Sequence, residues 1–230
     1  MSKFDLSLGD LFQQHGAVLL PVVTMISVAG IVLCSVVVLA IVIERGFALR
    51  RRRVMPSALL EQVRRYWYRG DIKAALECCD EHAVAISRIL KAGLLRHEAR
   101  TDEIEKALEA AGQFEANGLG SNVRGLGVIA NLAPMLGFLG TVTGMIKAFQ
   151  AIAAAGTSNP SLVASGISEA LLTTAAGLLV GIPALALFHF FRGRVDRFVT
   201  EMEEVALELV EDLTSQQRRL PSTREQADAV

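Results

Sequence analysis

Three long stretches of the chain are almost free of charged residues, and the charged residues are concentrated between and after them. The stretches cover residues 16–43, 126–155 and 162–191. Each is longer than the roughly 20 residues that an α-helix needs to cross about 30 Å of hydrocarbon. The pattern therefore predicts three transmembrane helices. The alternative is a soluble bundle, which would need three wholly apolar helices of this length in one small domain.

The polar region between the first two stretches also carries helical signals. Pro56 and Ser57 open a predicted helix that should stop at Gly70. Asp71 is in position to cap the following helix, which reads DIKAALECC, and AISRILKAGLLRH has apolar residues at helical spacing. Thr101 is followed by two acidic residues, which suit the positive end of a helix dipole. We expect the helix from Thr101 to run without interruption into the second apolar stretch.

The region after the third apolar stretch has the pattern of an amphipathic helix that continues the third span. Apolar residues recur there at steps of three and four, with acidic residues on the other faces. This apolar stripe consists of Val195, Phe198, Met202, Val205, Leu209 and Leu213. Such a stripe must be covered, most simply by the helix that begins at Thr101 and by neighbouring subunits. The polar sequence after Thr214 is expected to be disordered.

Basic residues indicate the orientation of the chain, because Lys and Arg near span ends favour the cytoplasm. Fifteen of them lie between residues 44 and 125, including the run Arg50, Arg51, Arg52 and Arg53, whereas the connection AGTSNPS between the second and third stretches has none. The N-terminus is therefore expected outside and the C-terminus in the cytoplasm. Because the basic cluster follows the first stretch and the apolar run is long, this stretch is not read as a cleaved signal peptide.

Together these patterns predict an all-α integral membrane protein in which two of the three transmembrane helices extend into a cytoplasmic helical bundle. The expected segments outside the spans are a periplasmic N-terminus (1–15), a cytoplasmic helical segment (44–125), a periplasmic loop (156–161), and a cytoplasmic amphipathic helix with a disordered tail (192–230).

Composition argues against several other functions. The formal net charge of −1 conceals the asymmetry of the basic residues, which indicates orientation and not nucleic-acid binding. The cysteines (Cys34, Cys78, Cys79) lack metal-ligand spacing and are interpreted as packing residues. No glycine-rich phosphate loop follows a predicted strand, and no histidine has the spacing of a metal or nucleophile site. We therefore expect no enzyme activity, no metal and no cofactor.

Small residues follow one face of each of the last two spans. Their spacing favours close helix packing, because small residues let backbones approach within a membrane. In the second span they are Gly137, Gly140, Thr141, Gly144 and Ala148; in the third they are Gly166, Ala170, Thr173, Thr174, Gly177, Gly181 and Ala184. Pro183 removes one helical hydrogen bond and is expected to act as a bend or soft point.

Four polar residues inside these spans are candidates for function. The hydroxyls of Thr141 and Thr174 can either bond carbonyls of their own helices or line a polar path. Glu169 lies about two turns into the third span, where a carboxylate is costly unless it is protonated, paired or hydrated. Lys147 lies at a similar depth near the outer end of the second span, where it can reach the interface or contact Glu169.

The paired motifs in these spans resemble the proton-channel region of the ExbB/TolQ/MotA family. The similarity covers APMLGFLGTVTGMIKAFQAIA, ISEALLTTAAGLLVGIPALAL and IERGFALRRRR, which follows the first span. Matched by motif, the family's pore threonines fall on Thr141 and Thr174, its glutamate on Glu169 and its proline on Pro183. One departure is VASGI, where many relatives have a proline at the position of Ser165.

The resemblance implies a subunit of an ion-driven motor in the bacterial inner membrane. ExbB-like proteins form a pentamer around the single spans of a smaller ExbD- or TolR-like partner, and the complex energises a TonB- or TolA-like transducer. The partner's transmembrane aspartate binds and releases the ion, expected to be a proton. Glu169 would then hydrate or hold the outer end of the pathway. The moving proton would belong to the partner.

Several alternatives stay open at this stage. The flagellar MotA branch is disfavoured because it normally has four spans, but the TolQ branch of envelope maintenance and cell division and the gliding-motor branch share the three-span layout. A membrane scaffold that conducts nothing is a different class, and it predicts no dependence on proton-motive force. A solute transporter ranks last, because three spans without an internal repeat leave little room for alternating access.

Overall fold

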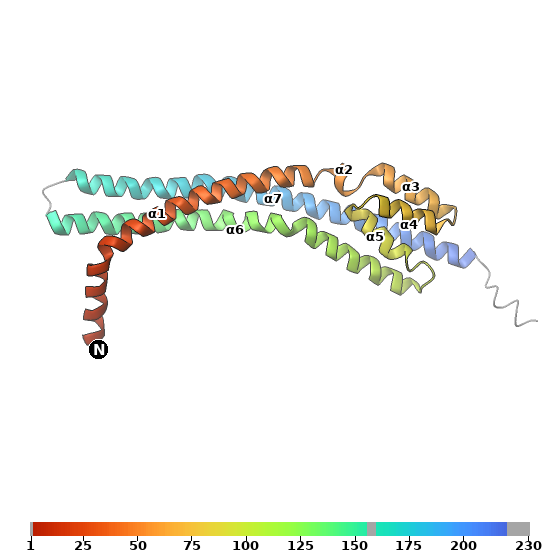
Figure 1. The fold of residues 1–230 in the computed structure, drawn as a ribbon, viewed down its shortest axis with the longest axis horizontal. Helices are drawn as coiled ribbons and strands as arrows, with labels where there is room; N and C mark the ends of the chain where they lie inside the picture. The colour runs from red at the N-terminus through yellow and green to blue at the C-terminus, as the bar shows by residue number, and fades with distance from the viewer. Residues whose placement is uncertain (1, 156–159, 220–230) are drawn as a thin grey trace, which may run out of the picture. The chain divides into compact units, whose positions relative to one another are not determined.

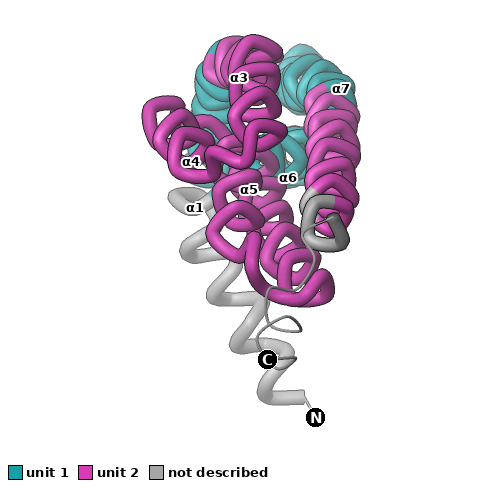
Figure 2. Tube along the Cα trace, turned by 90° about the vertical axis from the view of Figure 1, so that its right-hand side faces the viewer, with its two compact units in different colours: residues 1–43, 123–190 teal, residues 44–122, 191–230 magenta. Residues whose placement is uncertain are grey.

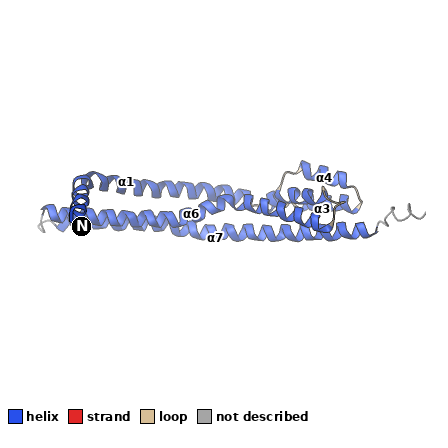
Figure 3. Ribbon diagram, turned by 90° about the horizontal axis from the view of Figure 1, so that it is seen from below, coloured by secondary structure: helices blue, strands red, loops and turns tan. Residues whose placement is uncertain are grey.

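A computed structural model describes residues 2–155 and 160–219 of the chain. Nearly all of this part is helical and none of it is strand (Figure 3). In chain order, the helices are α1 (Ser2–Ala48), α2 (Arg51–Val54), α3 (Ser57–Tyr68), α4 (Ile72–Glu81), α5 (Ala85–Leu94), α6 (Thr101–Ala155) and α7 (Pro160–Arg219) (Figure 1). Three helical stretches, Leu20–Ala48, Thr101–Ala153 and Val163–Asp212, are long and apolar enough to cross a membrane. The predicted fold class is thus confirmed.

The long helices extend beyond the apolar stretches that they contain. The helix predicted from Thr101 does run into the second span as the single helix α6. The expectation of disorder after Thr214 is wrong for residues 215–219, which continue α7 to Arg219. Gln and Arg are good helix formers, and adding residues to an existing helix needs no new nucleus. The rest of the expected tail (220–230) and residues 156–159 of the expected loop lie outside the described residues.

The chain divides into two compact units (Figure 2). Unit 1 comprises residues 1–43 and 123–190, and unit 2 comprises residues 44–122 and 191–230. The helices α1, α6 and α7 each contribute to both units. Unit 1 is made of three apolar helical segments, and unit 2 contains the short helices α2 to α5.

In unit 1, α1 packs antiparallel on α6. A Cβ added to Gly30 would lie 2.9 Å from the side chain of Leu136, and one added to Gly125 would lie 3.6 Å from Ile41. The small core between these contacts contains Cys34, Ile129 and Ala133, surrounded by Val38, Ile41, Leu136 and Val180. Large apolar side chains such as Met25 and Leu179 are more than 70% exposed on the outside. Exposed apolar surface on this scale suits lipid or further subunits, not water.

In unit 2, the turn between α3 and α4 is as predicted. Gly70 has a φ of +75°, a left-handed conformation that ends α3 and that glycine adopts without steric cost. The Asp71 carboxylate accepts a hydrogen bond of 3.1 Å from the Ala74 amide and so caps α4. Both sequence predictions are confirmed.

The last turns of α1 are held in unit 2 by polar contacts with α6. The Arg45 side chain is only 8% exposed, and its Nη1 donates a hydrogen bond of 2.8 Å to the carbonyl of Leu119. The Asn122 amide donates to both carboxylate oxygens of Glu44, at 2.8 and 3.0 Å. These bonds fix the register of α1 against α6 in this unit.

The apolar stripe of α7 lies mostly inside unit 2. Four of its described side chains are buried, namely Val195, Phe198, Met202 and Leu209. The expectation that α6 and other subunits cover this stripe is incomplete, because α5 also covers it. A Cβ added to Gly93 of α5 would lie 2.9 Å from Leu108 of α6 and 3.2 Å from Leu209 of α7. The α5 helix therefore lies between the two long helices.

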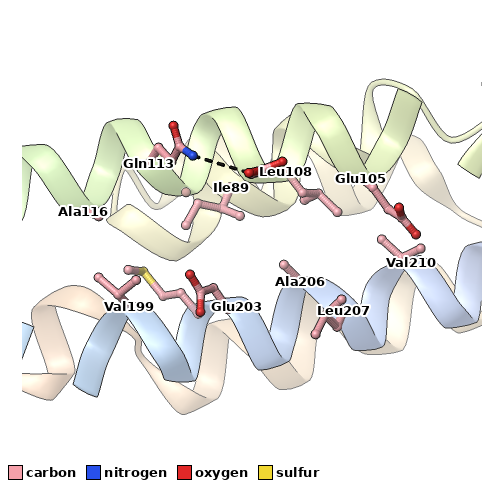
Figure 4. Close-up of a pocket in the computed structure, with 13 residues that line it drawn as sticks. Ile89, Glu105, Leu108, Gln113, Ala116, Val199, Glu203, Ala206, Leu207 and Val210 are labelled. Atoms are coloured by element: carbon pink, nitrogen blue, oxygen red, sulfur yellow. Dashed lines mark hydrogen bonds between the residues drawn. The ribbon is translucent and has the colours of Figure 1, made fainter. Parts of the chain in front are cut away.

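Beside this packing, α5, α6 and α7 line an open cavity of about 420 Å³ (Figure 4). Its apolar walls include Ile89, Leu108 and Val210, and the small residues Gly112 and Ala206 leave the space between the helices. Three carboxylates also border it, from Glu105, Glu109 and Glu203. Of the apolar stripe, Met202 lines this cavity and is only 2% exposed, so the cavity lies beside the stripe and does not uncover it.

Candidate ion-pathway site

The candidate site lies in unit 1, where α6 and α7 pack antiparallel through small residues. A Cβ added to Gly144 would lie 2.7 Å from Ala170, and one added to Gly140 would lie 2.3 Å from Thr173. Further along, Gly166 faces Ala148 and Gly137 faces Thr174 and Gly177. Small residues of the two helices thus lie opposite each other along one continuous contact.

Two glycines of α7 lie against backbone atoms of α6. A Cβ at Gly177 would lie 2.6 Å from the carbonyl oxygen of Ala133, and one at Gly181 would lie 3.1 Å from that of Ala130 and 2.5 Å from the ring of Pro134. Backbone atoms cannot move aside as a flexible side chain can. A residue with a side chain at either position would therefore push the helices apart.

The two predicted pathway threonines bond adjacent carbonyls of α6. Thr174 Oγ1 donates across the helix contact to the Gly137 carbonyl at 3.0 Å, and Thr141 Oγ1 donates to the Phe138 carbonyl at 2.7 Å. In a regular α-helix, the Gly137 carbonyl also accepts from the amide of Thr141, four residues later. Both side chains are half-buried. The structure therefore brings these two residues together at one point of the α6–α7 contact.

Glu169 lies away from the threonine pair. It precedes Thr174 by five residues, so its side chain leaves α7 about 140° away from that of Thr174. It is exposed in the single chain, and its backbone carbonyl accepts a hydrogen bond of 2.8 Å from Thr173 Oγ1. One chain alone does not assemble Glu169, Thr141 and Thr174 into one site.

The contact considered between Glu169 and Lys147 is not formed among the described residues. Glu169 directly precedes Ala170 and Lys147 directly precedes Ala148, and both alanines lie in the helix contact. One residue is about 100° of helical turn, so the Glu169 side chain points well away from that of Ala170 in the contact. Lys147 is half-buried on α6.

Pro183 lies inside α7, which continues on both sides of it.

The sequence reasoning missed a second polar contact in unit 1. Thr24 Oγ1 of α1 donates to its own helix at Leu20, at 2.8 Å, and lies 3.4 Å from Thr143 Oγ1 of α6. Both threonines are buried, as is Ser27 one turn further along α1. The spacing of Thr24 and Ser27 on one helix face was the available signal. This contact ties the first span to the segment that carries the candidate site.

Groups with other chemistry lie in unit 2. Cys78 and Cys79 are buried free thiols, and burial raises the pKa of Cys79 to about 12. A thiol that stays protonated is a poor nucleophile and metal ligand. Across residues 2–155 and 160–219, no three or more His, Cys, Asp or Glu side chains are grouped so that they could hold a metal ion.

The fold and the site define an α-helical membrane protein whose second and third spans pair through small residues around two threonines. The chain belongs to the MotA/TolQ/ExbB proton channel family, whose model matches residues 81–204. That match includes all of the second span and most of α7.

Several curated proteins are similar over most of their length. The chain is 28% identical to the biopolymer transport protein ExbB of Salmonella typhimurium over 222 residues, which cover 91% of this chain and 87% of that protein. It is 32% identical over 183 residues to the putative biopolymer transport protein ExbB-like 1 of a Synechocystis strain, covering 78% and 68% of the two chains. A shorter match of 132 residues, at 36% identity, covers 54% of this chain and 56% of exbB1 of Vibrio cholerae.

Proposed function

We propose that this chain is the ExbB-like stator subunit of a motor in the bacterial inner membrane. In this proposal it assembles as a pentamer around a small ExbD- or TolR-like partner that has one span with an aspartate. Proton flow through the complex then drives a TonB- or TolA-like transducer, which energises transport at the outer membrane. The N-terminus is periplasmic and the C-terminus cytoplasmic. The family membership and the names of the similar proteins support the class of this function.

The observation that carries the proposal is the threonine pair at the α6–α7 contact. Thr174 Oγ1 and Thr141 Oγ1 bond the adjacent carbonyls of Gly137 and Phe138, within spans that otherwise contain few polar groups. A hydroxyl can also accept a hydrogen bond, so each can solvate a passing carboxyl group without adding a charge. An ionised carboxylate in this setting is costly, whereas a protonated one can pass apolar surface.

The energy available fits a motor of this kind. Moving one elementary charge through 100 mV of membrane potential supplies about 2.3 kcal/mol, which is enough to bias a step with a low barrier. In this proposal Glu169 acts from a neighbouring copy or at the outer end of the pathway, because its own chain turns it away from the threonines.

The test uses a strain that lacks this chain and is complemented with the wild-type chain or its variants. The full-length chain carries a photo-crosslinking residue at an exposed position of α6, such as Phe138 or Val142. A motor subunit should crosslink to a small single-span protein in a pattern that changes when an uncoupler collapses the proton-motive force. Glu169→Gln should reduce the energy-dependent part of the pattern. A pattern that is identical with and without uncoupler would support the scaffold class instead.

A further inference from the structure

The arginines that indicated orientation also form a cluster that the proposed motor function does not use. Arg194 of α7 donates a hydrogen bond of 2.8 Å from Nε to the carbonyl of Leu49, at the junction of α1 and α2. Arg50 follows Leu49 directly. The structure thus brings a basic turn of α7 against the basic corner after α1, although the two segments are 145 residues apart.

Positive charge is in excess around this junction. The segments 44–53 and 191–201, both in unit 2, contain eight arginines and only three carboxylates. Two of the carboxylates are occupied: Glu201 lies 3.2 Å from Arg51, and Asp196 lies 3.9 Å from Arg192. The third, Glu44, is bonded to Asn122 and lies 3.6 Å from Arg45. Among the ion pairs of the described residues, none uses Arg50 or Arg194.

The guanidinium groups of Arg50 and Arg194 are held by aromatic rings. The Cζ of Arg50 lies 4.8 Å from the centre of the Phe47 ring, and the Cζ of Arg194 lies 5.9 Å from that of Phe198. Stacking on a ring uses the face of a guanidinium and leaves its N–H edge free to donate. For Arg194 the bond to Leu49 uses only Nε, so both Nη groups remain for another acceptor. Such an edge matches two oxygens of a phosphate.

The depth of the cluster indicates the source of the phosphate. The first candidate span ends at Ala48, so the cluster begins where that span stops. Phe47 is half exposed beside Arg50, so apolar surface that an acyl chain can cover adjoins the guanidinium. Basic residues next to a span attract anionic lipids. We propose that Arg50 and Arg194 bind the phosphate of an anionic phospholipid at the end of α1.

This site is independent of ion conduction and would persist if the proposed motor function were wrong. Its test is native mass spectrometry of the full-length chain in detergent, titrated with phosphatidylglycerol or with phosphatidylcholine of the same acyl chains. We expect preferential retention of phosphatidylglycerol. The double variant Arg50→Gln/Arg194→Gln should lower that retention by about five-fold for each arginine removed. Arg194→Lys, which keeps the charge but not the fork, should lose an intermediate amount.

Two controls separate the site from general attraction of charge. Arg65→Gln removes an exposed positive charge on α3 of the same unit and should leave lipid retention unchanged. Added inorganic phosphate should not displace the lipid if the acyl chains contribute to binding; full displacement would identify a site for free phosphate and overturn the lipid assignment. If the double variant fails to fold, Arg50→Gln alone removes an exposed charge of the site and should lower retention about five-fold. Equal retention of both lipids by the wild-type chain, or full retention by the variants of Arg50 and Arg194, refutes the proposal.

Discussion

Thr174 on α7 donates its hydroxyl hydrogen bond to the carbonyl of Gly137 on α6, at 3.0 Å. The bond crosses the contact between two helices that are otherwise joined by glycine, alanine and threonine. It requires the helices to be close, and the absence of a side chain at Gly137 and Gly177 allows that distance. The position that the family resemblance marks as functional is therefore also a structural link.

The two roles of Thr174 can be separated by conservative substitutions. Thr174→Val keeps the shape but loses the hydroxyl, and Thr174→Ser keeps the hydroxyl. Because the Gly137 carbonyl retains its helical bond, the Val variant should lose no more than about 1 kcal/mol of stability. We expect it to assemble normally, with energy-dependent activity at least about ten-fold lower, as for removal of one solvating group in a pathway. The Ser variant should stay active.

Thr141 offers a parallel test with a different bonding pattern. Its hydroxyl bonds only its own helix, at Phe138. Thr141→Val should therefore leave the α6–α7 contact unchanged and reduce activity as Thr174→Val does. The measurement is the activity of both Val variants in the complemented strain, normalised to the amount of the chain in the membrane. Full activity in both would remove the threonines from the pathway.

Two Gly→Ala substitutions should have opposite effects. Gly177→Ala puts a methyl group 2.6 Å from the Ala133 carbonyl, so we expect a loss of about 1–3 kcal/mol as the helices separate. Gly118→Ala meets no atom within 4 Å and should gain about 0.5–1 kcal/mol through helix propensity. Unfolding of the full-length protein in mixed detergent micelles measures both. Equal stability of the two variants would show that the close contact of α6 and α7 is absent in the membrane protein.

The two partners of the ion pair between α5 and α6 should differ in how much stability is lost when each is replaced. Arg88 donates to both oxygens of Glu115, at 2.5 and 2.6 Å, and this bonding raises the pKa of Arg88. The Glu115 side chain is 7% exposed and that of Arg88 is 52% exposed. Arg88→Met leaves a buried carboxylate without its partner and should cost about 1.5–3 kcal/mol. Glu115→Gln leaves an arginine that can reach water and should cost less. The reverse order in thermal unfolding would contradict this account.

The thiol of Cys79 should be unreactive in the folded protein. Burial raises its pKa from 9.0 to about 12, so it stays protonated where an unfolded thiol ionises. Its contribution to stability is complete below pH 9 and is lost as the pH rises from 9 to about 12. In a Cys34→Ala/Cys78→Ala background, labelling with N-ethylmaleimide near neutral pH should be at least about ten-fold slower than in a cysteine-free chain carrying Ser57→Cys at the exposed start of α3. Comparable labelling rates would show that the thiol is accessible.

Much of the fold follows from local signals in the sequence. The apolar stretches gave the spans, Gly70 and Asp71 gave the turn between α3 and α4, and Thr101 gave the start of α6. These signals are local because a cap, a turn or an apolar run depends on neighbouring residues. The end of α7 was missed because the polar residues after Thr214 continue a helix whose nucleus lies elsewhere.

The candidate site was less accessible to sequence reasoning. The spacing of small residues indicated a contact face, but it could not show that Thr174 bonds Gly137 of another helix. The Glu169–Lys147 contact was considered because the residues lie at similar depth, and depth carries no information on the direction of a side chain. Contacts between helices depend on rotation about each axis, which a single sequence does not specify.

The bond between Arg45 and Leu119 has a consequence for the order of synthesis. The two residues are 74 positions apart, so α1 leaves the ribosome long before its acceptor exists. Until then only the adjacent Glu44, 3.6 Å away in the folded chain, and water can serve the Arg45 guanidinium, and we expect this end of α1 to stay hydrated. In chains stalled before Leu119, the Arg45→Cys variant should react with a water-soluble maleimide, and in completed chains it should be protected. The end of the first span therefore reaches its final position late in translation, when it packs on a helix that is synthesised after it.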